Sequence, residues 1–211
     1  IKNEKIAYIM GAGDEVPLYL SQMGYEVTIL KPEEITLENL QNFQVVVMGI
    51  RAYNTVDELS FKQQLLFDFV KTGNTMIVQY NTTGKLTVKE LAPFSLKLSR
   101  DRVTEEDAEV RFLSPNHKIL NFPNKITSND FKGWVQEQGL YYPNEWDATF
   151  TPILSSNDKG EDPKNGGLLV AQYGKGYYIY TGLSFFRELP AGVSGAYRLF
   201  ANMISIGTKT N

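Results

Sequence analysis

The most promising chemical groups in the sequence are four polar residues at the end of a predicted strand. Residues 75–84 are predicted to form a buried strand that ends in a tight polar turn. In an α/β enzyme of this layout, the nucleophile stands at that turn. The residues available there, none of which is a thiol, are Gln79, Tyr80, Asn81 and Thr82. The sequence therefore argues against cysteine chemistry at this turn.

A second polar group, Arg51, Tyr53 and Asn54, follows the preceding predicted strand. The carboxyl ends of parallel strands meet at one edge of a sheet, so this group is expected beside residues 79–81, together with Arg187 from the end of the last strand. An arginine among amides and tyrosines suits a polar, uncharged or anionic small molecule, because its guanidinium is a fork of donors. The alternative is that Arg51 pairs with a carboxylate of the middle segment and only anchors it.

Residues 131–146 are the most unusual stretch, because they hold both tryptophans together with Glu137 and Glu145. Aromatic faces beside carboxylates and amides suit a sugar ring, so Trp134, Glu137, Glu145 and Trp146 are candidate ligand-binding residues. The two carboxylates also suggest glycoside hydrolysis as an alternative, since that reaction needs a pair of carboxylates roughly 5–9 Å apart. The alternative is that the aromatic residues only form a small core of their own.

Other familiar motifs are incomplete. The turn at residues 11–13 lacks the third glycine of a dinucleotide-binding loop, since Val16 occupies that position, so we expect a tight strand-to-helix turn there. The single histidine, His117, has no metal-ligand spacing around it and no nucleophile elbow accompanies it. We therefore expect no catalytic residue, no metal site and no cofactor in this chain.

The bulk composition narrows the function further. The chain has 211 residues, 42% of them hydrophobic, which is enough to bury a core without disulfides, and it contains no cysteine. A net charge of −3 with interspersed signs argues against a nucleic-acid partner. No apolar run approaches the ~18 residues of a membrane span. Because the chain starts at Ile1, we expect a processed product or part of a longer polypeptide.

The elements that must position these groups alternate between strand and helix. Strands are predicted at residues 5–10, 26–30, 45–50 and 75–80, with an amphipathic helix over 57–71. A hairpin of 167–173 with 177–183 and a helix over 195–206 close the chain. This alternation favours a parallel, doubly wound sheet. We expect one α/β domain over 1–211, with an irregular, aromatic-rich insertion over about 85–166 that has short strands near 94–98 and 109–112.

Several long strings carry a family resemblance. The chain resembles the C-terminal region of PIG-L/LmbE-type (GlcNAc) deacetylases of Bacteroidetes at residues 6–17, 51–55, 78–81, 98–103, 134–137 and 182–192. More distantly, its layout is similar to the class I glutamine amidotransferase-like group. The turn at 116–119 and the closing strand at 176–182 are similar to those of the ThuA-like branch of that group.

The resemblance implies a flavodoxin-like three-layer sandwich, covalently linked in its parent protein to an N-terminal zinc-dependent de-N-acetylase. The zinc ligands of that enzyme have no match here, and the amidotransferase triad is missing, since Phe185, Phe186 and Arg187 replace its His–Glu pair. The resemblance thus implies a non-catalytic accessory domain, a pseudoenzyme, that recognises a carbohydrate or packs on the catalytic domain. The alternatives are a glycoside hydrolase using Glu137, Glu145 and Arg187, and a structural or oligomerisation module. A periplasmic or secreted location is slightly favoured over a cytoplasmic one.

Overall fold

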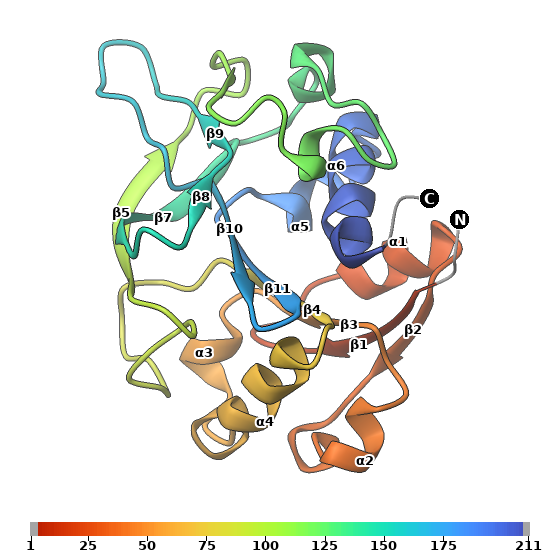
Figure 1. The fold of residues 1–211 in the computed structure, drawn as a ribbon. Coiled ribbons are helices and arrows are strands. Elements are labelled where there is room, and N and C mark those ends of the chain that lie inside the picture. The colour runs from red at the N-terminus through yellow and green to blue at the C-terminus, as the bar shows by residue number, and fades with distance from the viewer. Residues whose placement is uncertain (1–3, 209–211) are drawn as a thin grey trace.

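The computed structural model describes residues 4–208 and is built on a seven-stranded sheet with the order β2-β1-β3-β4-β11-β10-β8 (Figure 1). The strands are β1 (Lys5–Ile9), β2 (Glu26–Ile29), β3 (Val45–Met48), β4 (Thr75–Gln79), β8 (Thr151–Pro152), β10 (Leu168–Tyr173) and β11 (Gly176–Thr181). The first five in the spatial order are parallel, whereas β10 is antiparallel to β11 and to β8. The predicted doubly wound sheet and its closing hairpin are thus confirmed.

The central strands are apolar because helices cover both of their faces. Every residue of β3 and β4 is buried, as is typical of the middle of a parallel sheet. One face carries α1 (Val16–Gln22), α5 (Phe185–Glu188) and α6 (Ser194–Ile204). The other face carries α2 (Leu37–Leu40), α3 (Ala52–Thr55) and α4 (Leu59–Lys71). The two hydrophobic cores lie on opposite sides of the sheet, which makes the domain a three-layer sandwich (Figure 1).

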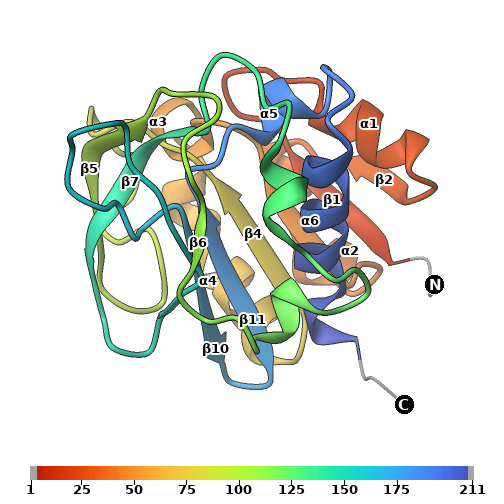
Figure 2. The ribbon, with the colours of Figure 1, turned by 90° about the horizontal axis from the view of Figure 1, so that it is seen from above.

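The segment between β4 and β10 is more ordered than the sequence indicates. It forms a two-stranded antiparallel sheet of β5 (Leu96–Val103) with β7 (Gly139–Trp146), and a second one of β6 (Arg111–Phe112) with β9 (Leu154–Ser155). Short 3₁₀ turns complete the chain at Pro32–Glu34, Lys118–Leu120, Ser128–Phe131 and Ser205–Gly207. Figure 2 shows β5 and β7 together on the side of the molecule away from β2 and α1.

The start of β7 is attached to the end of β11, and this attachment positions the site described below. The Leu140 N–H donates to the Gly182 carbonyl at 3.0 Å, and Gly139 forms an antiparallel bridge with Leu183. A side chain at position 139 would meet the Tyr142 hydroxyl at 2.4 Å and the Gly182 carbonyl at 2.5 Å, so only glycine fits there. The segment preceding β7 therefore lies over the carboxyl edge of the sheet.

Candidate functional site at the carboxyl ends of the strands

A pocket of about 460 Å³ opens beside the carboxyl end of β11. It is lined by Arg100, Arg102, Glu137, Leu140, Tyr141 and Arg187. Arg100 and Arg102 come from β5, Glu137 from the segment just before β7, Leu140 and Tyr141 from the start of β7, and Arg187 from α5. Three guanidinium groups thus face one carboxylate, and the pocket lies where open α/β sheets bind ligands.

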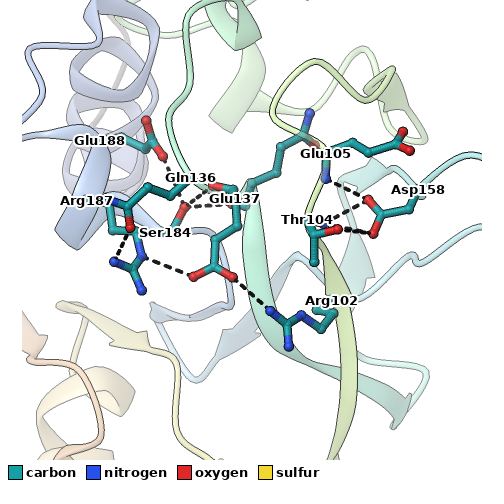
Figure 3. A network of polar contacts seen from close by, with 10 residues as sticks. Arg102, Thr104, Glu105, Gln136, Glu137, Asp158, Ser184, Arg187 and Glu188 are labelled. Carbon is teal, nitrogen blue, oxygen red and sulfur yellow. Dashed lines mark hydrogen bonds and ion pairs between the residues drawn. The ribbon is translucent and has the colours of Figure 1, made fainter.

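Glu137 orients two of these arginines. Its side chain is only 9% exposed, and its Oε1 accepts from the Arg187 Nε at 3.1 Å while its Oε2 lies 3.6 Å from an Arg102 nitrogen (Figure 3). Arg187 also donates to the Gln136 side-chain oxygen and lies 4.8 Å from the centre of the Phe186 ring. A carboxylate that is nearly buried between two guanidinium groups holds both in place.

The backbone of this segment is tied to the end of the sheet by Ser184. The Ser184 hydroxyl donates to the Glu137 carbonyl at 2.6 Å, and the Ser184 N–H donates to the Gln138 carbonyl at 3.0 Å. At the other side of the pocket, Asp158 accepts from the Thr104 N–H and hydroxyl and from the Glu105 N–H, which fixes the end of β5 (Figure 3). The arginines and Glu137 are therefore carried by anchored segments.

Arg100 is the charged residue of the pocket with the fewest side-chain partners. It is exposed, and its side chain has no ion pair or hydrogen bond with any residue in the range 4–208. Asp101, between the two arginines of β5, lies 3.9 Å from Lys164. Arg100 and Arg102 both line the pocket.

Two tyrosines connect the pocket with the end of β4. The rings of Tyr80 and Tyr141 are nearly parallel, at 10°, with centres 6.2 Å apart, and Phe186 packs on Tyr80 at 5.4 Å. Burial raises the pKa of the Tyr80 hydroxyl, while the nearby charges of Arg51 and Arg187 lower it. Arg51 therefore belongs to the same electrostatic environment as the pocket.

Strained backbone is concentrated at this edge. Arg51, Gln136 and Tyr141 have φ angles of 56°, 67° and 49°, and they are the non-glycine residues with positive φ among residues 4–208. A left-handed conformation costs a non-glycine residue on the order of 1–3 kcal/mol and is typical of functional sites. Tyr141 lines the pocket, Gln136 accepts from the Arg187 side chain, and the Arg51 N–H donates to the Tyr80 carbonyl, so the three strained residues lie at the same edge of the sheet.

The predicted residues at the end of β4 form a buried layer beneath the pocket. The Asn81 Oδ1 accepts from the Tyr53 N–H at 2.9 Å, its Nδ2 donates to the Gln79 carbonyl at 3.2 Å, and its own N–H donates to the Tyr180 hydroxyl at 2.9 Å. Asn54 likewise bonds the backbone of the following loop. These amides hold the turn after β4 and support the site; Asn81 is fully buried.

Buried polar atoms without partners gather in the same region. Within residues 4–208 they belong to Arg51, Tyr53, Gln79 and Thr87. Thr87 is adjacent to the others because its N–H donates to the Tyr53 carbonyl at 2.8 Å. Such atoms are rare in folded proteins, and Arg51, Tyr53 and Gln79 come from the ends of β3 and β4 or from the turn after β3.

Replacing Asn81 with alanine is expected to lower the free energy of unfolding by about 2 kcal/mol, because it leaves the Tyr53 N–H buried without an acceptor. Urea unfolding followed by circular dichroism measures the change. Asn129→Ala, an exposed asparagine, is the matched control and is expected to change stability by less than about 0.5 kcal/mol. Equal losses for the two variants would contradict a structural role of Asn81.

Three of the predicted ligand-binding residues lie away from the pocket. Trp134 is 2% exposed and packs between Phe131 and Phe185, in the small core that the sequence left as the alternative. Trp146 packs against the opposite core of the sheet. Glu145 is exposed and pairs with Lys97 at 2.7 Å.

The placement of Glu145 argues against a paired-carboxylate mechanism. Glu137 lies before the first residue of β7 and Glu145 at its far end, a separation along an extended strand on the order of 20 Å. Glycoside hydrolysis needs two carboxylates within about 10 Å of each other. The predicted pair therefore does not converge in one cleft.

The glycine turn after β1 is occupied by the protein itself. Asp14 accepts from the Tyr8 hydroxyl at 2.7 Å, from the Val16 N–H at 2.9 Å and from the Ile50 N–H at 3.2 Å. A side chain at Gly11 would lie 2.2 Å from the Ile50 carbonyl. As predicted, the turn serves packing, and a carboxylate already occupies the position a phosphate would take at the start of α1.

Sequence reasoning missed Arg100, Arg102 and Tyr141 as pocket residues, and it missed Glu188. The available signal for Arg100 and Arg102 was their spacing of two residues, because side chains two positions apart in a strand point to the same face. It could be used only if the strand was expected to continue beyond residue 98. Glu188 is fully buried, and burial raises its pKa to about 7, although hydrogen bonds from the Val135 N–H and Ser184 act against the shift. No local sequence pattern predicts a buried carboxyl group at position 188.

Within residues 4–208, no group of acidic, histidine or cysteine side chains has the arrangement of a metal site. No helix in that range is both long and apolar enough to cross a bilayer. His117 accepts the Ile119 N–H at 3.2 Å and so closes a local turn.

Solved structures of low sequence identity share this fold. The cytoplasmic protein STM1381 of Salmonella typhimurium LT2 is 12% identical, with a TM-score of 0.61 over 97% of this chain and 100% of that one. A ThuA-like protein from Bacteroides uniformis is 14% identical, with a TM-score of 0.58 over 98% and 91%. A β-galactosidase from Rahnella sp. R3 is 14% identical, with a TM-score of 0.53 over 95% of this chain and 30% of that one.

The chain has the flavodoxin-like, class I glutamine amidotransferase-like α/β fold. It is similar in fold to ThuA-like proteins, so the predicted fold class and the more distant resemblance are confirmed at that level. No protein-family model matches the sequence, and no curated protein matches it. The resemblance to PIG-L/LmbE-type deacetylases finds no support in these comparisons.

Proposed function

We propose that this chain is a non-catalytic, amidotransferase-like domain that binds a carbohydrate in the pocket at the carboxyl edge of its sheet. The observation that carries the proposal is the state of the turn after β4. Asn81 occupies the turn where this layout places a nucleophile, and its amide is buried and committed to the Tyr53 N–H and the Gln79 carbonyl. The pocket beside that turn stays open and is lined by arginines and a tyrosine.

The other nucleophilic or acidic groups near the pocket are also committed to the structure. The Ser184 hydroxyl is buried and donates to a backbone carbonyl, and Glu137 is held by two arginines. Neither has a histidine beside it, since the single histidine of the sequence, His117, closes a turn next to α6. Recognition therefore explains the arrangement better than catalysis. A purely structural module would have no pocket at this edge.

The accessory role in a PIG-L-type carbohydrate de-N-acetylase is a second part of the proposal. It is supported by the sequence strings that resemble the C-terminal region of such enzymes, and by the occurrence of the same fold within a longer β-galactosidase chain. Reading the coding sequence upstream of Ile1 tests it. A Pro-His-x-Asp-Asp run in that frame is the expected result, and a frame without one would remove the deacetylase partner from the proposal.

Isothermal calorimetry of the chain with neutral, N-acetylated and acidic monosaccharides tests carbohydrate binding itself. Tyr141→Gly is expected to weaken binding about tenfold, because it removes the ring that lines the pocket, while relief of the left-handed strain limits the loss of stability to about 1 kcal/mol. Tyr173→Ala, which changes a tyrosine outside the pocket, is the control and is expected to leave affinity unchanged. The absence of heat with every sugar would contradict carbohydrate recognition.

A further inference from the structure

The charge of the pocket differs from that of the chain. Arg100, Arg102 and Arg187 oppose the single carboxylate of Glu137, which leaves a surplus of three minus one, or +2, in a protein whose net charge is −3. Both oxygens of Glu137 already face Arg187 and Arg102, so this carboxylate orients the guanidinium groups and cannot neutralise all of them. Guanidinium groups with unused donors are a common recognition element for carboxylates and phosphates.

The apolar residues that line the pocket indicate which kind of molecule bears the anionic group. Leu140 and the half-buried ring of Tyr141 form the apolar part of the pocket, with Tyr80 stacked behind Tyr141. A volume of about 460 Å³ lies within the range of sites for small organic ligands and far exceeds that of a lone inorganic ion. An aromatic and aliphatic wall beside charged donors fits a sugar ring, whose C–H face is apolar and whose substituents are polar.

A phosphate-bearing ligand fits less well. Backbone N–H groups at the start of a helix are a common binding site for phosphate, but at the start of α1 in this chain Asp14 receives the Val16 and Ile50 N–H groups. The Ala12 N–H is likewise bonded to the Ile50 carbonyl at 2.9 Å. The candidate anion site is therefore the group of guanidinium side chains in the pocket.

We infer that the pocket binds an acidic sugar, a pyranose that bears a carboxylate, with Arg100 and Arg102 receiving the carboxylate and Tyr141 contacting the ring. This inference rests on the proposed carbohydrate-binding function and narrows it to one class of ligand. Arg100 is the discriminating residue, because it is exposed, lines the pocket and forms no ion pair or side-chain hydrogen bond with residues 4–208. Its removal therefore tests the ligand without disturbing the support of the pocket.

The test is a calorimetric titration of the whole chain with D-glucuronate, D-glucose and acetate at low ionic strength. Glucuronate is expected to bind at least about tenfold more tightly than glucose, and Arg100→Gln to weaken glucuronate about tenfold without changing glucose, since a charge-assisted contact is lost. Lys97→Gln removes a positive charge from the same strand outside the pocket, and it is expected to change neither affinity. The unfolding midpoints of both variants confirm that they fold.

Each other outcome has a definite meaning. Equal affinity for glucose and glucuronate would overturn the acidic class and leave the proposed carbohydrate function intact. Binding of acetate as tightly as glucuronate would overturn the sugar part of the inference. No binding of either sugar would overturn both the inference and the proposed function. Equal losses in Arg100→Gln and Lys97→Gln would overturn the inference, because they would show that the positive charge along β5, rather than a contact in the pocket, attracts the ligand.

Discussion

Replacing Trp134 with alanine is expected to lower the free energy of unfolding by about 3–5 kcal/mol, the range for a large aromatic side chain removed from a packed core. Trp134 is 2% exposed, stacks on Phe131 with ring centres 5.6 Å apart, and meets Phe185 edge-on at 5.9 Å. Its indole N–H donates to the Asp130 carbonyl at 2.9 Å. The residue joins the middle segment to α5 and α6, so its loss loosens both.

Urea unfolding at neutral pH measures this effect, and two further variants sharpen it. Trp134→Phe keeps an aromatic ring but leaves the Asp130 carbonyl without its donor, and is expected to cost about 1–3 kcal/mol. Trp146→Ala removes the partly exposed tryptophan and is expected to cost less than Trp134→Ala. A ligand platform at Trp134 would behave in the opposite way, with weakened sugar binding and nearly unchanged stability.

The Glu188→Gln variant is expected to become more stable than the parent chain by about 3 kcal/mol as the pH rises from about 5 to 8. Burial raises the pKa of Glu188 to about 7 from 4.5, so the folded protein binds a proton at this site that the unfolded chain has already released. The stability contributed by the protonated carboxyl group is present below about pH 4.5 and is lost as the pH rises to about 7. A shift of this size corresponds to about 3 kcal/mol.

Glutamine reproduces the protonated carboxyl group without titrating. Its carbonyl can accept from the Val135 N–H, and its amide can take the position near Ser184 that is 3.3 Å from the serine oxygen. The quantity to measure is the difference in unfolding free energy between the variant and the parent at each pH, because the difference cancels groups common to both. Glu145→Gln, an exposed glutamate, is the control, with a difference expected to stay within about 1 kcal/mol. A flat difference for Glu188→Gln would show that this carboxyl group is ionised in the fold throughout the range.

Glu188 is connected to the pocket through Ser184 and the segment that carries Glu137. The oxygens of Glu188 receive the Val135 N–H and lie beside Ser184, and Ser184 in turn holds the Glu137 carbonyl. The charges nearest to Glu188 are Glu106, which raises its pKa further, and Arg187, which lowers it. The segment that carries the pocket carboxylate is thus supported by a group that titrates near neutrality.

The edge of the sheet was predictable because it depends on local patterns. Continuous apolar runs such as 45–48 identify strands buried on both faces, and their carboxyl ends coincide in any parallel sheet. This reasoning placed Arg51, Tyr80 and Arg187 together without any long-range information. It could not distinguish the residues that are accessible at this edge from the residues that support them. Tyr53, Gln79 and Asn81 belong to the same edge but are buried.

The middle segment could not be predicted in the same way. Its strands β5 and β7 pair across about forty residues of chain, with bulges between Leu98 and Val103, and neither strand has a clean alternation of apolar and polar residues. Glu137 was selected from its aromatic neighbourhood, yet its partners Arg102 and Arg187 come from segments far away in the sequence. Trp134 and Trp146 were selected from the same neighbourhood, but Trp134 lies in a core and the partly buried Trp146 packs against one.

What the sequence determined by itself is the parallel α/β frame and the absence of a thiol at the turn after β4. Both follow from the identity of residues and from short-range periodicity, which need no knowledge of the partner strands. The tertiary structure alone decided that the arginines of β5, Glu137 and Arg187 form one pocket. That assembly depends on the antiparallel pairing of β5 with β7 and on the contact of Gly139 with Leu183, which are long-range contacts that no local pattern specifies.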